Sequence, residues 1–279
     1  MRSDGHMAAG IGTLADAVAT DAGGSIRGAT FRVGLRILFF PALIGLWELA
    51  VLVSGIRSYL LPAPSAIIAE IVDSAPHLMQ HGLRTATEAL LGFSLSMVVG
   101  IATAMLIVYS TYLRSVLLPL LVAANAIPKV ALAPLLLIWL GLGIESKVAM
   151  AFLLSFFPIV INAATGLGEV EPEMLNLFRL LRATEFQKFV KVRFPHSLPA
   201  LMDGLKIAMP LSIIGAIVGE FVGAQEGLGY LIVLATLTLN TELVFASIVV
   251  VALLSIGLFE VLVLVESRLL RWRPSARRF

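Results

Sequence analysis

Long apolar blocks separated by short polar breaks dominate the pattern of this chain. Six of the blocks approach the roughly 20 residues that an α-helix needs to cross the hydrocarbon core of a bilayer. The blocks lie at 34–54, 87–109, 116–140, 147–166, 200–223 and 243–266. The third contains Pro119, Pro128 and Pro134, so we expect a kinked or broken helix there. The pattern predicts an all-α integral membrane protein with six transmembrane helices.

A further apolar segment, 227–239, is too short for the same interpretation and favours a re-entrant or interfacial helix. The basic residues support this count. With the N-terminus in the cytoplasm, only four of the 20 Lys and Arg residues fall outside or at mid-depth, namely Arg57, Arg84, Lys129 and Lys147. This bias predicts that both termini are cytoplasmic and that the segment 55–86, with a short surface helix, is external.

One charged segment, 169–199, interrupts the apolar pattern between two predicted spans. Glu171 and Pro172 suit the start of a first helix. Thr184 and Gln187 have the spacing of a capping box, which predicts a second short helix. By the orientation above this segment is cytoplasmic, and a helix-break-helix in that position predicts a docking surface for a partner outside the membrane.

Composition excludes several function classes. Residues are 59% hydrophobic and 14% charged, whereas soluble domains average about 25% charged residues. Without cysteine the chain forms no disulfide and no thiolate metal site. The phosphate-binding pattern GxxxxGK[ST] is absent, so we do not expect this chain to hydrolyse nucleotide by a P-loop.

An intramembrane enzyme is the first rival hypothesis. The patterns HExxH and GxSxG are absent, and all four histidines (His6, His77, His81 and His196) lie outside the predicted spans. This argues against an intramembrane protease or lipid transferase. His77 and His81 have i, i+4 spacing but no evident third ligand, so a solvated helix face is the favoured interpretation and no metal site is expected.

The charged segment and the span after it resemble the loop that identifies permease subunits of type I ABC importers. Val192, Arg193, Phe194 and Pro195 fit the Ile-x-Leu-Pro end of that pattern. Counting back, Arg182 takes the position of the glycine, and 176–178 take that of Glu-Ala-Ala. Because positive φ is costly for arginine, we expect Arg182 to be helical. The strings NAIPKVALAPLLLIWLGLG and GLGYLI resemble the subgroup for nitrate, taurine, sulfonates and vitamin precursors.

The resemblance implies a type I ABC importer permease fold, with 31–272 as one transmembrane domain and 169–199 as the coupling loop. Residues 1–30 are expected to be a disordered cytoplasmic N-terminus, and 273–279 a cytoplasmic tail. The implied assembly lies in a bacterial plasma (inner) membrane. It has two permeases, which form a homodimer or a pair with a sister subunit, two ATPases that bind ATP and Mg, and an external solute-binding protein. No cofactor in this chain and no nucleic acid is implied. The implied ATPase-docking residues are Leu180, Leu181, Arg182, Ala183, Thr184, Glu185, Phe186 and Gln187.

The sequence is compatible with two classes of transported solute. A small organic or inorganic anion (a sulfonate, taurine, nitrate or a carboxylate) suits Lys129, because an ionisable residue within a span usually faces the protein interior or a water-filled cavity. An uncharged vitamin precursor of the thiamine pyrimidine or riboflavin type is the alternative. A secondary transporter without an ATPase is the rival of another class, although no inverted repeat is evident.

Several further polar and small residues lie within the predicted spans. Candidates for the translocation path are Lys129, Asn125, Ser155, Asn162 and Glu220. Lys129 is expected to attract an anion, to pair with Glu220 or to snorkel, and Glu220 to face the path, close an external gate or lie at the headgroup boundary. Gly215, Gly219 and Gly223 share one helix face and predict close helix packing. Glu260 is expected to form an internal salt bridge.

Overall fold

The computed structural model describes residues 39–271 of the 279-residue chain. The predictions for 1–30 and 273–279 therefore lie outside the described residues. The chain divides between Ala66 and Ile67 into two units. In the first unit the helix Phe39–Ser54 is followed by a turn and by the start of α2 (Pro64–Asp73). There Ser65 donates its backbone N–H and its hydroxyl to the Glu48 carboxylate, at 3.0 and 2.7 Å.

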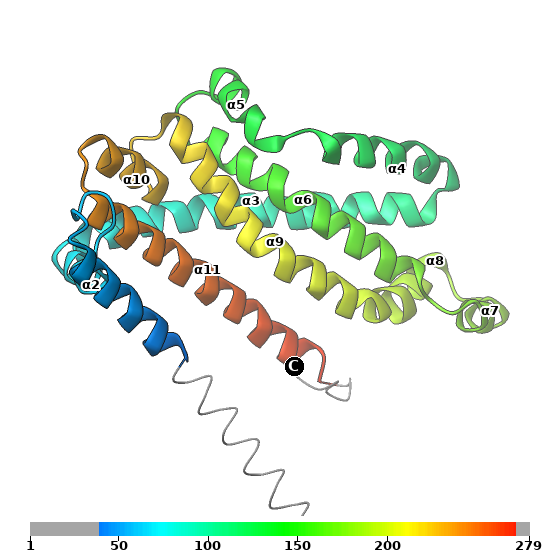
Figure 1. Cartoon of the computed structure of the whole chain (residues 1–279). Helices are drawn as coiled ribbons and strands as arrows, with labels where there is room; N and C mark the ends of the chain where they lie inside the picture. The colour runs from blue at the N-terminus through cyan, green and yellow to red at the C-terminus, as the bar shows by residue number, and fades with distance from the viewer. Residues whose placement is uncertain (1–38, 272–279) are drawn as a thin grey trace, which may run out of the picture. The chain divides into compact units, whose positions relative to one another are not determined.

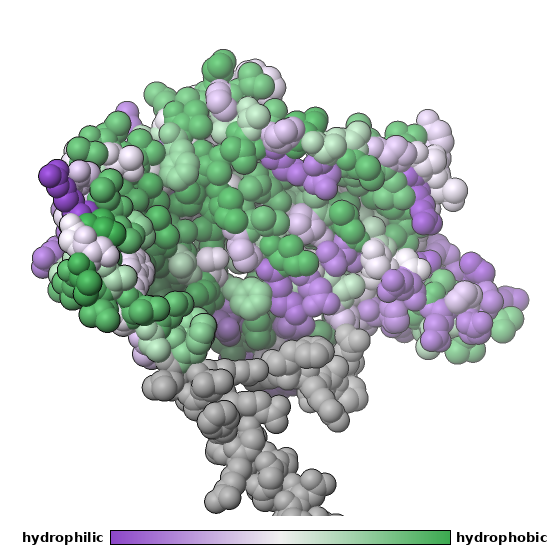
Figure 2. Space-filling view, in the orientation of Figure 1, coloured by the Kyte–Doolittle hydropathy of each residue, from purple (hydrophilic) through white to green (hydrophobic). Residues whose placement is uncertain are grey.

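The second unit contains the long helices. The bundle is made of α3 (Ala75–Tyr109), α6 (Ile144–Gly168), α9 (Phe194–Gly223) and α11 (Thr241–Leu269), with α9 running alongside both α6 and α11 (Figure 1). All four are long and apolar enough to cross a membrane. Their surface is largely apolar, whereas polar residues gather at the end that carries α7 and α8 (Figure 2). The all-α fold class is confirmed.

The predicted third span is broken, as its prolines indicate. It consists of α4 (Thr111–Ala126), the 3₁₀-helix η1 (Lys129–Leu132) and α5 (Ala133–Leu140), and the two parts meet at an angle of 83°. Ile127 adopts an extended conformation because the following Pro128 disfavours the helical one. Counting this pair as one span gives five among residues 39–271, and the remaining prediction, 34–54, corresponds to the shorter apolar helix Phe39–Ser54.

The start of α3 differs from the prediction. The surface helix expected in 55–86 is present as α2, but α3 then begins at Ala75, well before the expected position 87. Pro76 fits the first turn of a helix, and no breaking residue follows it. His77, His81 and Arg84 consequently lie on a transmembrane-length helix and not in a separate external loop.

Close contacts between helix backbones hold α9 against its neighbours. A Cβ added at Gly215 would come within 2.6 Å of the Ala151 Cα atom, and one at Gly219 within 3.0 Å of the Lys147 Cα atom, both on α6. At Gly223 the nearest atom would be a methyl of Leu137 on α5, at 2.8 Å. These three contacts lie within one chain, and at such distances only glycine permits the approach.

The remaining short helices lie at the two ends of the bundle. The segment 227–239 forms α10 (Leu228–Leu237), a short helix that contacts α3, α9 and α11. The charged segment forms α7 (Pro172–Leu180) and α8 (Glu185–Lys188). Figure 1 shows α7 and α8 at the opposite end of the bundle from α10.

Candidate functional site

The turn between α7 and α8 is fixed by local hydrogen bonds. The Thr184 hydroxyl accepts from the Gln187 N–H at 3.3 Å, and the Gln187 side chain accepts from the Thr184 N–H at 2.9 Å. The predicted capping box is confirmed, and Pro172 lies in the first turn of α7 as expected. These bonds satisfy backbone groups that would otherwise lack a partner at the start of α8.

The expectation for Arg182 is wrong. Its φ is +52°, in the left-handed region where the family pattern has glycine. The reason is the way α7 ends. Ala183 N–H donates to the Phe178 carbonyl at 3.0 Å and Arg182 N–H to the Arg179 carbonyl at 2.9 Å. This pair of bonds is a Schellman motif, which requires a left-handed residue after the helix cap. Arg182 therefore forms the tight turn that glycine forms in the pattern.

Three large apolar side chains project from this turn into solvent. Leu180, Leu181 and Phe186 are 82%, 68% and 75% exposed. We call these three the docking patch. Exposed apolar groups held on a rigid turn are typical of a protein–protein contact. The neighbouring Lys188 is not available to a partner, since it is buried and pairs with Glu185 at 2.7 Å.

The turn between α7 and α8 carries the docking patch, and we call it the docking turn. It continues without interruption into a helix long enough to cross a membrane. From α8 the chain passes through the π-helical turn η2 (Phe189–Arg193) into α9, so that residues 185–223 form one helical segment. Arg193 lies at the end of the π turn and donates to the Leu167 carbonyl, near the end of α6, at 2.6 Å. Its guanidinium also lies 5.5 Å from the centre of the Tyr109 ring, at the end of α3.

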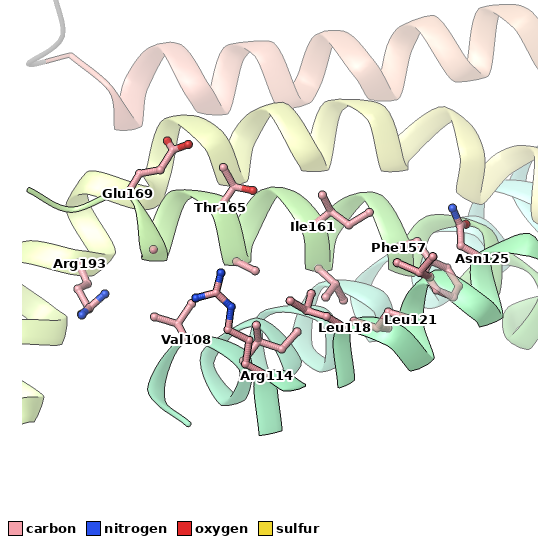
Figure 3. Close-up of a pocket in the computed structure, with 15 residues that line it drawn as sticks. Val108, Arg114, Leu118, Leu121, Asn125, Phe157, Ile161, Thr165, Glu169 and Arg193 are labelled. Atoms are coloured by element: carbon pink, nitrogen blue, oxygen red, sulfur yellow. The ribbon is translucent and has the colours of Figure 1, made fainter. Parts of the chain in front are cut away.

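A cavity of about 630 Å³ lies between α4 and α6. Figure 3 shows Asn125 and Phe157 at one end of it and Glu169 and Arg193 at the other, with the Arg114 guanidinium pointing from α4 toward α6. Most of the wall is aliphatic, with polar groups from Asn125, Thr165, Glu169 and the two arginines. The cavity therefore offers an apolar volume with a few polar groups at its ends, as small-molecule sites do.

Lys129 lies beside this cavity and contacts two of the residues that line it, Asn125 and Phe157. Its Nζ donates to the Asn125 Oδ1 at 2.7 Å and lies 4.5 Å from the centre of the Phe157 ring. The expected pairing with Glu220 is not found, because Glu220 is bonded elsewhere. The Lys129 ammonium is held by an amide oxygen and an aromatic face at the break between α4 and α5.

Three of the predicted path residues lie at helix–helix contacts and not at the cavity. The Ser155 hydroxyl is 2.7 Å from that of Ser96, between α6 and α3. Asn162 donates to the Pro158 carbonyl and faces Gly204 on α9. Glu220 is 1% exposed and enclosed by α3, α9 and α10. Each has a polar partner inside the protein, which is the usual solution for a polar side chain in a span.

The first backbone N–H groups of α10 are bound by side chains of other helices. Gly229 N–H donates to the Glu220 carboxylate, Leu228 N–H to the Thr85 hydroxyl at 2.9 Å and Gly227 N–H to His81 Nδ1 at 3.0 Å. Thr85 in turn donates to Glu220 at 2.7 Å. We call Glu220, Thr85 and His81 the α10 cap. Helix N-termini need such acceptors because their N–H groups have no partner within the helix.

A second buried group lies beside the α10 cap. Lys147 is 2% exposed and donates to the carbonyls of Leu142, Gly143 and Gly223 at 2.7, 3.0 and 3.2 Å. It thus binds the carbonyls at the end of α9 and beyond α5. Glu88, also buried, pairs with Arg84 at 3.2 Å. Sequence reasoning missed Lys147, Glu88 and Thr85, because nothing local to them indicates partners on distant helices.

Two remaining expectations concern metal and Glu260. Within residues 39–271 no three His, Cys, Asp or Glu side chains are grouped so as to hold a metal ion, and His81 instead bonds α10. Glu260 is exposed on α11 and has no salt bridge with another described residue. The ion pair that α11 does make is between Glu266 and Lys206 of α9, at 3.0 Å.

These features are those of a multi-pass membrane protein with an exposed apolar turn between two short helices and no P-loop motif in its sequence. Comparison with known proteins identifies its family. Residues 96–271 match the family of binding-protein-dependent transport system inner membrane components, and the chain belongs to this family. It is therefore the permease subunit of an ATP-driven ABC importer of the inner membrane. In this family a separate ATPase binds ATP and a binding protein delivers the solute.

Individual permeases of this family are similar to the chain over most of its length. The chain is 39% identical to the formylaminopyrimidine transport permease protein ThiX of Halalkalibacterium halodurans, over 85% of this chain and 94% of ThiX. It is 34% identical to the riboflavin transport system permease protein RibX of Chloroflexus aurantiacus, over 87% of this chain and 91% of RibX. A solved structure of the MetNI methionine ABC transporter in an inward-facing conformation has a similar fold. Its TM-score is 0.55 at 17% identity, covering 68% of this chain and 98% of that chain.

Proposed function

We propose that the docking patch binds the partner ATPase on the cytoplasmic side and that two copies of this chain form the permease core. The observation that carries the proposal is the exposure of Leu180, Leu181 and Phe186 on a turn fixed by a capping box and a Schellman motif. A rigid apolar patch loses little conformational entropy on binding, which favours a stable contact. The excess of Lys and Arg at the α7–α8 end supports the cytoplasmic orientation.

The test is co-purification with the partner ATPase from native membranes. We expect Phe186→Ala to reduce the recovered ATPase at least tenfold while the permease still inserts. The matched control is Leu237→Ala, which removes an equally exposed apolar side chain from α10, at the opposite end of the bundle. Equal recovery with both variants would refute the assignment of the docking patch. An ATPase-free wild-type permease whose uptake survives ATP depletion would favour a secondary transporter instead.

We further propose that the cavity between α4 and α6 belongs to the translocation path and that the solute is a nitrogen heterocycle of the vitamin-precursor type. The names of ThiX and RibX support this class. The cavity suits it as well, since most of its wall is aliphatic and the few polar groups lie at its ends. A mostly apolar volume with a few polar groups is appropriate for a planar, uncharged ring system.

A small anion is the second candidate, because three cationic side chains (Lys129, Arg114 and Arg193) surround the same cavity. The binding protein separates the two classes. Isothermal titration of that protein with formylaminopyrimidine, riboflavin, taurine, an alkylsulfonate and nitrate identifies the solute class directly. Tight binding of a heterocycle supports the first candidate, and tight binding of an anion alone supports the second.

A further inference from the structure

Arg193 occupies a position where three parts of the permease meet. It belongs to the helical segment 185–223 that begins in the docking turn, it bonds α6, and its guanidinium lies near the Tyr109 ring of α3. It also lines the cavity at the end opposite Asn125 (Figure 3). Within the described residues, no other side chain of the docking turn or the π turn lines that cavity.

The contact with α6 is a strong one. The Leu167 carbonyl is among the last four of α6, which have no partner within their own helix. A guanidinium at this place satisfies the carbonyl and interacts favourably with the negative end of the helix dipole. Leu167 itself is buried in the core, so the bonded backbone cannot move without moving α6.

An aromatic cluster joins the end of α3 to the π turn that contains Arg193. The Tyr109 ring lies 6.3 Å from that of Phe189, which lies 5.8 Å from that of Phe194. Phe189 is the first residue of the π turn, and Phe194 directly follows its last residue. π turns are rare and frequently occur at functional positions in long helices. This one turns the arginine at its end toward α6 and α3.

We propose that Arg193 is the positioning residue that transmits movement of the docking turn to α6 and so to the cavity. This inference rests on the proposed function of the docking patch. A helix that continues from α8 into α9 carries a displacement along its own axis, and the end of α6 nearest the docking turn follows in register only if it is fixed to the π turn. The Arg193–Leu167 bond attaches it at the level where the cavity begins. One turn further along α9, Ser197 and Ala200 pack against Gly166 of α6. This close contact restricts sliding of α9 along α6.

The experiment compares Arg193→Ala, Arg193→Lys and Lys191→Ala in the reconstituted complex of permease, ATPase and binding protein. Lys191 is the matched control, since it is exposed, carries the same charge and lies in the same π turn. The readout is solute taken up per ATP hydrolysed. We expect Arg193→Ala to lower this ratio at least tenfold while ATPase co-purification stays within twofold of wild type. Arg193→Lys should recover part of the ratio, because an ammonium reaches the Leu167 carbonyl but cannot lie flat on the tyrosine. Lys191→Ala should match wild type.

A second readout separates transmission from simple structural support. The chain has no cysteine, so Thr165→Cys places a single reporter in the cavity. Its labelling rate by a charged maleimide should differ between ADP and an ATP-locked state, and Arg193→Ala should abolish the difference. Wild-type coupling in Arg193→Ala, an equal loss in Lys191→Ala, or a persistent labelling difference would each overturn the inference. If instead the unmutated complex shows no ATP-dependent uptake, the proposed function fails independently of Arg193.

Discussion

Substitution of Thr85 tests the α10 cap. The Thr85 hydroxyl accepts from the buried Leu228 N–H and donates to the Glu220 carboxylate. In Thr85→Val the shape is kept and both bonds are lost. An unsatisfied buried N–H costs about 1–3 kcal/mol, and a hydrogen bond between uncharged groups contributes about 0.5–1.5 kcal/mol. We therefore expect a net loss near the middle of the combined range, about 3 kcal/mol.

Matched controls come from the same helix. Thr85→Ser keeps the hydroxyl and removes one methyl group, which costs about 1 kcal/mol. Thr87 is exposed and its hydroxyl bonds only the Leu83 carbonyl of its own helix, so Thr87→Val should have no effect on α10. The three variants therefore separate the hydrogen bonds from packing and from the general effect of a threonine-to-valine change.

The assay is hydrogen exchange of the α10 amides, measured by mass spectrometry on the permease in lipid nanodiscs. Since 1.4 kcal/mol corresponds to a factor of ten, Thr85→Val should speed exchange of the Leu228 and Gly229 amides roughly a hundredfold. Thr85→Ser should change it about fivefold and Thr87→Val not measurably. If Thr85→Val and Thr85→Ser exchange at the same rate, the α10 cap does not hold this helix and the reasoning fails.

Three further predictions concern other parts of the chain. Thr184→Ala removes the capping-box acceptor of α8, which costs about 1 kcal/mol, so ATPase recovery in a pull-down should fall several-fold. Gly215→Val forces a side chain against the Ala151 backbone, which cannot yield. Overpacking of about 1–3 kcal/mol should lower the thermal midpoint in detergent, whereas Gly257→Ala, with open space around it, should leave the midpoint unchanged. Lys129→Met should reduce uptake without reducing ATPase recovery, and unchanged uptake would remove Lys129 from the translocation path.

Local sequence patterns predicted the features that depend on neighbouring residues. The broken third span follows from Pro128 and Pro134, whose rings exclude particular hydrogen bonds and conformations whatever surrounds them. The start of α8 follows from Thr184 and Gln187, which satisfy each other within one turn. Apolar length likewise identified the long helices, because lipid imposes the same requirement on every span.

Features that depend on distant partners could not be predicted in this way. Glu220 and Thr85 are 135 positions apart, and no periodicity in either helix indicates that they meet. Arg182 illustrates a different limit of prediction from local sequence. The steric rule against positive φ is correct on average, but two hydrogen bonds to α7 and an exposed side chain outweigh it at a helix end. The family pattern, which has glycine there, contained the better indication.

The two ends of α9 are both attached, and this restricts how the permease can move. At one end Arg193 bonds α6, and at the other Lys147 of α6 bonds the Gly223 carbonyl. Between them the glycines bring the two backbones into direct contact. Because packed interfaces of this kind do not deform continuously, α6 and α9 should move as one body. By contrast, α4 has no buried residue and adjoins the 83° break before α5. The cavity lies along this weakly packed boundary, so a change in its width requires movement of α4 against the α6–α9 pair.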